Sequence, residues 1–332
     1  MVRCGARREI VGSSRLLDFL NMLAFLFPGQ GAQVPGMLHQ MPDHCKITAT
    51  FEEARQVLGQ DIFKLDTEQA LSSTVAVQLA LLISAVASTR ALQAEGIKFD
   101  LVAGLSVGAF AAAVAAEALT FKDALPLVKL RAELMEKAYP CGYGLSVVVG
   151  LNEQQLSKIL SEISKPEAPV FLANLNAPTQ IVIAGSDAGM NAVLDRAKIE
   201  GARTAKRLEV SVPSHCALLK PVADELTRWM SKIEMKTPNA TYVSNRRARA
   251  LRDPEGIRED LATNIQYAVR WHDAVTVAYE RGIRLFIELP PGRTLTDLVT
   301  AAFPDARSVA FEQMRIDSLV KLIKRFAAST EL

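Results

Sequence analysis

The feature that most constrains the fold is the segment Gly-Leu-Ser-Val-Gly at 104–108, which separates an apolar run at 99–105 from an alanine-rich run at 109–118. This order predicts a buried strand, a tight turn and a helix. The glycines two places before and after Ser106 give the turn room, and the turn pushes the serine hydroxyl out above the edge of the sheet. The unpaired N–H groups of a helix that begins at Val107 would face a negative charge forming beside Ser106. The segment therefore predicts a nucleophile elbow suited to acyl transfer.

Composition and charge argue against several other classes of function. The 332 residues are 49% hydrophobic, and 38 basic residues nearly balance 36 acidic ones. With a net charge of +2, no overall field attracts nucleic acid or a membrane, and the longest apolar stretches, such as 75–87, fall short of a bilayer span. The cysteines form no C-x-x-C pair and are Cys4, Cys45, Cys141 and Cys216. Without a metal or disulfide pattern, a reducing cytoplasm is the expected location.

The order of the expected elements indicates an α/β fold with a large α/β-hydrolase-like domain at 22–144 and 211–332 and a parallel sheet. Residues 1–21 have no cleavage pattern and are interpreted as a peripheral N-terminal extension. The glycine-rich loop at 28–33 lacks the P-loop lysine and indicates close approach of backbone N–H groups to a ligand. The expected strands of this domain are 23–27, 99–105 and 285–288, and its expected helices include 47–58, 74–94, 121–138, 217–231, 256–266 and 271–280.

A second, smaller unit is expected at 145–210. Its expected strands are 145–149, 170–174, 180–184 and 202–210, and its expected helices are 153–163 and 187–200. The order β-α-β-β-α-β is that of the split β-α-β arrangement. We therefore expect a ferredoxin-like subdomain inserted in the large domain.

A nucleophilic serine needs a base, and the candidates are few: His39, His44, His215 and His272. His215 follows a strand end where the chain re-enters the large domain, which places it at the same sheet edge as Ser106. In an α/β-hydrolase the acidic residue lies between the serine and a histidine close to the C-terminus. The position of His215 therefore favours another serine-dependent fold.

Arg131 lies within the expected helix 121–138. A guanidinium in an amphipathic helix usually belongs to a solvated face or an ion pair. A functional role fits if the substrate is an acyl group that ends in a carboxylate, which arginine binds bidentately.

These segments together resemble the malonyl-CoA:acyl-carrier-protein transacylase family from residue 22 onward. The matching segments are Phe-Pro-Gly-Gln-Gly-Ala-Gln at 27–33, Gly-Leu-Ser-Val-Gly at 104–108, Arg131 with Met135, Asn-Leu-Asn-Ala-Pro at 174–178, Val-Pro-Ser-His-Cys at 212–216 and Glu-Leu-Pro-Pro-Gly at 288–292. The resemblance implies an [acyl-carrier-protein] S-malonyltransferase (EC 2.3.1.39), an acyltransferase that works through a malonyl-serine intermediate. The family also has an inserted ferredoxin-like subdomain, which the order of elements predicts independently.

The resemblance implies a role for each matching residue. The expected roles are nucleophile for Ser106, general base for His215, oxyanion-hole N–H donors for Gln30 and Val107, binding of the malonate carboxylate for Arg131, and orientation of the histidine by the main-chain carbonyl of Asn264. No tightly bound cofactor and no metal is implied. Malonyl-CoA is the implied substrate, and a phosphopantetheine-type thiol on an acyl carrier protein is the implied acceptor.

The subtype is predicted from segments that depart from the carrier-protein transacylases of fatty acid synthesis. Those enzymes commonly read Asn-Val-Asp where this chain reads Ser-Asn-Arg-Arg-Ala-Arg at 244–249. This segment, with those at 35–39 and 73–78, is more similar to the malonyl transferase (epsilon) subunit of bacterial malonate decarboxylase. That subtype would add other decarboxylase subunits as partners, and the alternative is a transacylase of fatty acid or polyketide synthesis.

Asn176 and a basic cluster of Arg246, Arg247 and Arg249 are candidate contacts for the carrier or for CoA. A charge run is usually a solvated surface, but this one suits an acidic carrier or phosphate groups. Two other classes of function remain open. A serine thioesterase or hydrolase would release malonate without a thiol acceptor, and a non-catalytic docking subunit would carry a decayed site.

Overall fold

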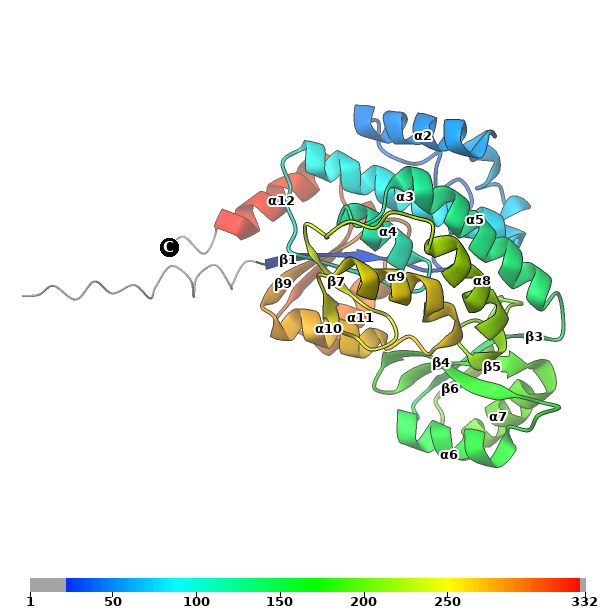
Figure 1. Cartoon of the computed structure of the whole chain (residues 1–332). Coiled ribbons are helices and arrows are strands. Elements are labelled where there is room, and N and C mark those ends of the chain that lie inside the picture. The colour runs from blue at the N-terminus through cyan, green and yellow to red at the C-terminus, as the bar shows by residue number, and fades with distance from the viewer. Residues whose placement is uncertain (1–21, 329–332) are drawn as a thin grey trace, which may run out of the picture.

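The computed structural model describes residues 22–328, which form an α/β fold as the sequence predicts (Figure 1). The expected N-terminal extension at 1–21 lies outside the described residues. One six-stranded sheet has the order β10-β9-β1-β2-β7-β8. Its strands are β1 (Met22–Phe27), β2 (Leu101–Gly104), β7 (Thr241–Val243), β8 (Ala250–Leu251), β9 (Ile283–Glu288) and β10 (Arg307–Ala310). All neighbours are parallel except β7 and β8, so the predicted parallel sheet is correct for all but one edge.

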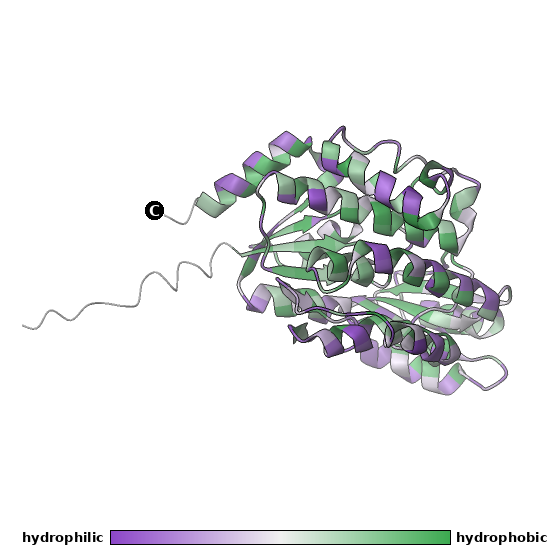
Figure 2. Ribbon diagram, turned by 45° about the horizontal axis from the view of Figure 1, so that its top comes forward, coloured by the Kyte–Doolittle hydropathy of each residue, from purple (hydrophilic) through white to green (hydrophobic). Residues whose placement is uncertain are grey.

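Helices cover both faces of this sheet. Successive residues of a strand point to opposite faces, so each strand contributes to two apolar cores. Phe25 and Phe27 of β1 belong to the larger apolar core, and Ala24 and Leu26 to the core on the other face. The larger core is covered by α2 (Cys45–Leu58), α3 (Thr74–Ala94), α4 (Gly108–Ala115), α5 (Phe121–Ala138) and α12 (Ile316–Ala328). The other face is covered by α10 (Trp271–Glu280) and α11 (Thr294–Ala302). Figure 2 shows the strands between these layers in the green of hydrophobic residues.

Helix α3 is buried on nearly all sides, whereas most surface helices bury a single stripe. By length and composition it could cross a membrane, but 89% of its most apolar window is buried inside the fold, as in the core helix of a globular domain. Its start is capped by the Ser73 hydroxyl, which accepts a hydrogen bond of 3.2 Å from the N–H of Val75. Gly96, with φ 80°, follows its end, as the sequence predicts.

A second, four-stranded antiparallel sheet has the order β4-β5-β3-β6. Its strands are β3 (Tyr143–Val149), β4 (Val170–Ala177), β5 (Gln180–Ser186) and β6 (Thr204–Arg207), and its helices are α6 (Glu153–Ile163) and α7 (Asp187–Ile199). The expected β-α-β-β-α-β order is therefore present, and this unit lies at the lower right of Figure 1. Its division from the large domain at residues 145 and 210 stays a prediction.

The largest differences from the expected elements lie in the last third of the chain. The expected helix 217–231 is a 3-10 turn (Ala217–Leu219) followed by α8 (Lys220–Met230), and 256–266 is α9 (Pro254–Thr263) followed by a second turn (Asn264–Gln266). Strands β7, β8 and β10 have only three, two and four residues, too few for a period-2 pattern. Three further 3-10 turns are Ile62–Lys64, Ala70–Ser72 and Phe311–Gln313.

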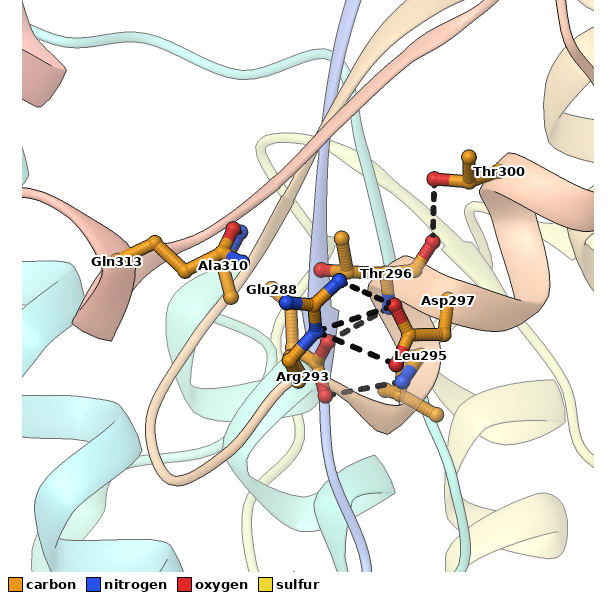
Figure 3. A network of polar contacts seen from close by, with 8 residues as sticks. All are labelled: Glu288, Arg293, Leu295, Thr296, Asp297, Thr300, Ala310 and Gln313. Carbon is orange, nitrogen blue, oxygen red and sulfur yellow. Dashed lines mark hydrogen bonds and ion pairs between the residues drawn. The ribbon is translucent and has the colours of Figure 1, made fainter.

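A buried carboxylate fixes the chain between β9 and α11 (Figure 3). Glu288, the last residue of β9, is fully buried and accepts hydrogen bonds of 3.0 and 2.6 Å from the backbone N–H groups of Leu295 and Thr296. A helix leaves its first N–H groups unpaired, and this carboxylate satisfies two of them. Burial raises the pKa of Glu288. The result is a fixed position for the start of α11.

Candidate active site

The predicted elbow is present between β2 and α4. A Cβ on Gly104 would lie 2.1 Å from the carbonyl carbon of Gly108, and a Cβ on Gly108 would lie 2.2 Å from the carbonyl oxygen of Phe27, so both glycines are required. Ser106 has φ 58°, a left-handed conformation that residues with side chains rarely adopt, and is 9% exposed. Helix α4 begins at Gly108 with Val107 as its N-cap, one residue later than predicted.

His215 lies beside Ser106, although 109 positions separate them in the chain. Its Nε2 is 2.6 Å from Ser106 Oγ, and its Nδ1 is 2.9 Å from the main-chain carbonyl oxygen of Asn264. Because a carbonyl oxygen can only accept, Nδ1 carries the proton and Nε2 is free to accept the proton of the Ser106 hydroxyl. This is the arrangement of a nucleophile, its base and a group that orients the base.

The protonation states around the pair support the same direction of proton transfer. Burial, followed in effect by the positive charge of Arg131, lowers the pKa of His215 to about 4, so its imidazole is neutral at neutral pH. Burial raises the pKa of the adjacent Cys216 to about 12, and its thiol donates to the carbonyl oxygen of Pro213 at 3.2 Å. Cys216 is therefore a thiol rather than a reactive thiolate.

Arg131 is fully buried and reaches the same hydroxyl group. Its Nη2 donates to Ser106 Oγ at 3.2 Å, and its Nη1 donates to Oε1 of Gln78 at 2.7 Å and to the sulfur of Met135 at 3.4 Å. Within residues 22–328 no carboxylate pairs with this guanidinium, and its Nε has no hydrogen-bond partner. Burial lowers the pKa of Arg131 to about 9, which still leaves it protonated at neutral pH. The guanidinium is thus a buried cation among neutral groups, an environment that favours the approach of an anion.

A cleft of about 870 Å³ lies between the two sheets, next to the elbow. The loop 28–33, with Gln30, and the elbow residue Leu105 line one wall, and β4 and β6 line the other. Ser106 does not itself line the cleft. Asn176 does, and its Oδ1 is a buried acceptor without a hydrogen-bond partner in the described chain. Lys206, Arg207 and Glu209 also line this wall, and Arg207 is ion-paired with Asp187.

The predicted basic cluster lies elsewhere. Arg246, Arg247 and Arg249 line a separate hollow of about 170 Å³. Arg247 and Arg249 are exposed, whereas the guanidinium of Arg246 lies 3.5 Å from the centre of the Tyr267 ring and 3.6 Å from the carboxylate of Glu259. The structure thus brings Asn176 to the cleft and the three arginines to a different surface.

The remaining candidates do not approach Ser106. His39 contacts Asp66 at 3.1 Å, His44 accepts a hydrogen bond from the N–H of Lys46 at the start of α2, and the His272 ring stacks against that of Phe303. Over the described part of the chain, no group of three His, Cys, Asp or Glu residues is arranged to hold a metal ion.

Sequence reasoning missed two residues that contact the site directly. Gln78 of α3 binds Arg131, and Asn245, just after β7, accepts a hydrogen bond of 2.8 Å from the N–H of Ser106 at its Oδ1. Asn245 could have been found from the sequence. It follows the short run 240–243, which could be predicted as a third strand that ends at the same sheet edge as Ser106. Gln78 had no such signal, because it is one of several polar residues in the expected helix 74–94.

Comparisons with known proteins identify the family of the chain. Residues 24–324 match the family model of the acyl transferase domain. The chain is 36% identical to the malonyl CoA-acyl carrier protein transacylase of Salmonella typhimurium, over 84% of this chain and 92% of that protein, and 35% identical to the transacylase of Bacillus subtilis, over 84% and 90%.

Solved structures are similar as well. The malonyl CoA-acyl carrier protein transacylase of Coxiella burnetii superposes with a TM-score of 0.87 at 34% identity, covering 93% of this chain and 98% of that one. A malonyl-transacylase in complex with a type II PKS acyl-carrier protein superposes with a TM-score of 0.86 at 35% identity, covering 92% and 99%. None of these relatives is a malonate decarboxylase subunit, so the predicted subtype gains no support, while its stated alternative does. The chain is an acyltransferase and belongs to the malonyl-CoA:acyl-carrier-protein transacylase family.

Proposed function

We propose that this protein transfers the malonyl group of malonyl-CoA to the thiol of an acyl carrier protein, as a transacylase of fatty acid or polyketide synthesis. Ser106 is the nucleophile, His215 its general base and Arg131 the binding group for the free carboxylate of malonate. The names of the relatives support this reading over malonate decarboxylase.

The observation that carries the proposal is the buried guanidinium of Arg131 beside Ser106, which has no carboxylate partner among residues 22–328. Arg131 Nη2 lies 3.2 Å from Ser106 Oγ, so an acyl group bound to that oxygen would start within reach of the cation. A malonyl group ends in a carboxylate, whereas acetyl and longer saturated acyl groups do not. Arginine binds a carboxylate through charge-assisted hydrogen bonds, which makes the diacid the matching substrate.

Each half-reaction is an acyl transfer with balanced proton movement. His215 Nε2 takes the hydroxyl proton as Ser106 Oγ attacks the thioester carbonyl of malonyl-CoA. The N–H groups of Gln30 and Val107 stabilise the oxyanion. The C–S bond then breaks, CoA leaves with the proton from His215, and malonyl-Ser106 remains. The thiol of the carrier's phosphopantetheine-type arm attacks this ester by the same steps and restores Ser106.

The acyl donor and the carrier are assigned to different surfaces. The cleft fits the pantetheine arm, with the unpartnered Oδ1 of Asn176 as an acceptor for its amide groups and Lys206 for the CoA phosphates. The exposed Arg247 and Arg249 provide a basic surface for an acidic carrier. Reversing both charges should slow transfer to the carrier and weaken its dependence on salt, while formation of malonyl-Ser106 from malonyl-CoA stays unchanged.

The test of the reaction is covalent labelling. Radiolabelled malonyl-CoA should label the wild-type protein, the label should be absent in Ser106→Ala, and a holo carrier should remove it as malonyl-carrier. Labelling that survives in Ser106→Ala would contradict the nucleophile. Release of free malonate at the same rate with and without carrier would instead indicate a thioesterase.

A further inference from the structure

The backbone of the elbow is held by a side chain from a neighbouring strand. Asn245 follows β7, the parallel neighbour of β2, so its position is beside the residues that follow β2. It is 3% exposed. Its Oδ1 accepts a hydrogen bond of 2.8 Å from the N–H of Ser106, and its Nδ2 donates one of 2.8 Å to the carbonyl oxygen of Gly104.

These two bonds act on a strained part of the chain. Ser106 has φ 58°, a conformation that persists in a residue with a side chain only where its surroundings impose it. The Asn245 amide binds the two peptide groups that flank Leu105, accepting from the N–H of Ser106 and donating to the carbonyl oxygen of Gly104. An ionised aspartate of the same size would only accept, and a leucine would do neither.

Asn245 is itself fixed on both sides. Its N–H donates to the carboxylate oxygens of Asp260 at 3.0 and 3.1 Å, and its carbonyl oxygen accepts from the N–H of Arg270 at 2.9 Å. Asp260, in α9, is 5% exposed and also accepts from the hydroxyl of Tyr242 at 2.7 Å. A rigid chain of contacts therefore runs from α9 through Asn245 to the elbow.

We propose that Asn245 is a positioning residue for acyl transfer, because its amide sets the direction of Ser106 Oγ toward His215 and of the Val107 N–H toward the forming oxyanion. The inference rests on the proposed function. A positioning role can be distinguished from a merely structural one, because displacement of Ser106 lowers the rate of the chemical step more than it lowers the affinity for malonyl-CoA.

The test measures single-turnover formation of malonyl-Ser106 over a series of malonyl-CoA concentrations, by rapid quench. Asn245→Ala should lower the maximal rate constant by about 10- to 100-fold, with the half-saturating concentration of malonyl-CoA little changed. Ser244→Ala is the matched control, because Ser244 is adjacent and 5% exposed but bonds the N–H of Arg249 instead of the elbow. Urea unfolding of each variant records the loss of stability.

Asn245→Asp provides a second test, which does not depend on whether the alanine variant folds. When protonated, the introduced carboxyl group can both donate to Gly104 and accept from Ser106, so the rate of this variant should recover as the pH falls from 8 toward 6, where the wild type is flat. Wild-type rates in Asn245→Ala, or equal losses in Asn245→Ala and Ser244→Ala, would overturn the inference. Absence of labelling in the wild type would overturn the proposed function instead.

Discussion

A negative charge placed beside Arg131 would neutralise it, and this tests the proposed role of Arg131 in selecting a diacid. Gln78 is 1% exposed, and its Oε1 accepts a hydrogen bond of 2.7 Å from Arg131 Nη1. Gln78→Glu keeps the size of the side chain and this acceptor but adds a negative charge. The guanidinium would then have a permanent partner, and the malonate carboxylate would compete with it.

The size of the effect follows from the contact. Opposite unit charges about 4 Å apart attract by about 4 kcal/mol at an effective dielectric constant of about 20. The lost hydration of the new carboxylate offsets part of this, which leaves a net effect on the order of 2–3 kcal/mol. We therefore expect kcat/KM for malonyl-CoA to fall by about 30- to 150-fold. Acetyl-CoA has no carboxylate, so its transfer should change little.

The assay compares kcat/KM for malonyl-CoA and acetyl-CoA in the wild type, Gln78→Glu and Gln78→Leu. The leucine variant loses the hydrogen bond without gaining a charge, so it reports the contribution of packing alone. A larger loss for malonyl-CoA in the glutamate variant than in the leucine variant is expected. Equal losses in both variants, or an unchanged malonyl-CoA value in Gln78→Glu, would refute the reasoning.

Three further predictions follow from other parts of the structure. The pKa of His215 is lowered to about 4, and the neutral imidazole is the proposed base. The rate of malonyl-Ser106 formation should therefore be constant from pH 8 to 5 and fall only as the pH approaches 4. A fall centred near pH 6.5 would show that the pKa of the histidine is not shifted. Glu288→Gln replaces one acceptor oxygen at the start of α11 with a donor, and urea unfolding should report a loss of about 1–3 kcal/mol. Gly108→Ala would place a Cβ 2.2 Å from the carbonyl oxygen of Phe27, so thermal unfolding should occur at a clearly lower temperature and labelling of Ser106 should be lost.

The parts of the fold that could be predicted are those with local signals. Helices α3, α5, α6 and α10 have the expected bounds, and the first three start after an N-cap side chain: Ser73, Thr120 and Asn152. The elbow was predictable from the local motif at 104–108, although the steric need for Gly108 comes from the carbonyl oxygen of Phe27 on β1. The pairing of Ser106 with His215 followed from the small number of histidines and from strand ends meeting at one sheet edge.

The contacts that were missed are those made across the fold. Gln78 and Arg131 lie 53 positions apart, and Asn245 and Ser106 lie 139 apart, so no periodicity connects them. The burial of α3 on all sides was also beyond a pattern argument, because an apolar helix covered by others has no polar face to mark its orientation. The antiparallel edge strand β8 has only two residues and leaves no pattern at all.

The position of α3 in the core limits how the acyl selectivity of this protein could evolve. The helix that carries Gln78 is packed on nearly every face, so it cannot turn or slide without opening voids among its neighbours. With Arg131 as the proposed carboxylate-binding group, moving its guanidinium to admit a longer diacid requires compensating changes in volume along α3 and α5 together. Enzymes of this fold with a different diacid length should differ in their interior as much as at the mouth of the cleft.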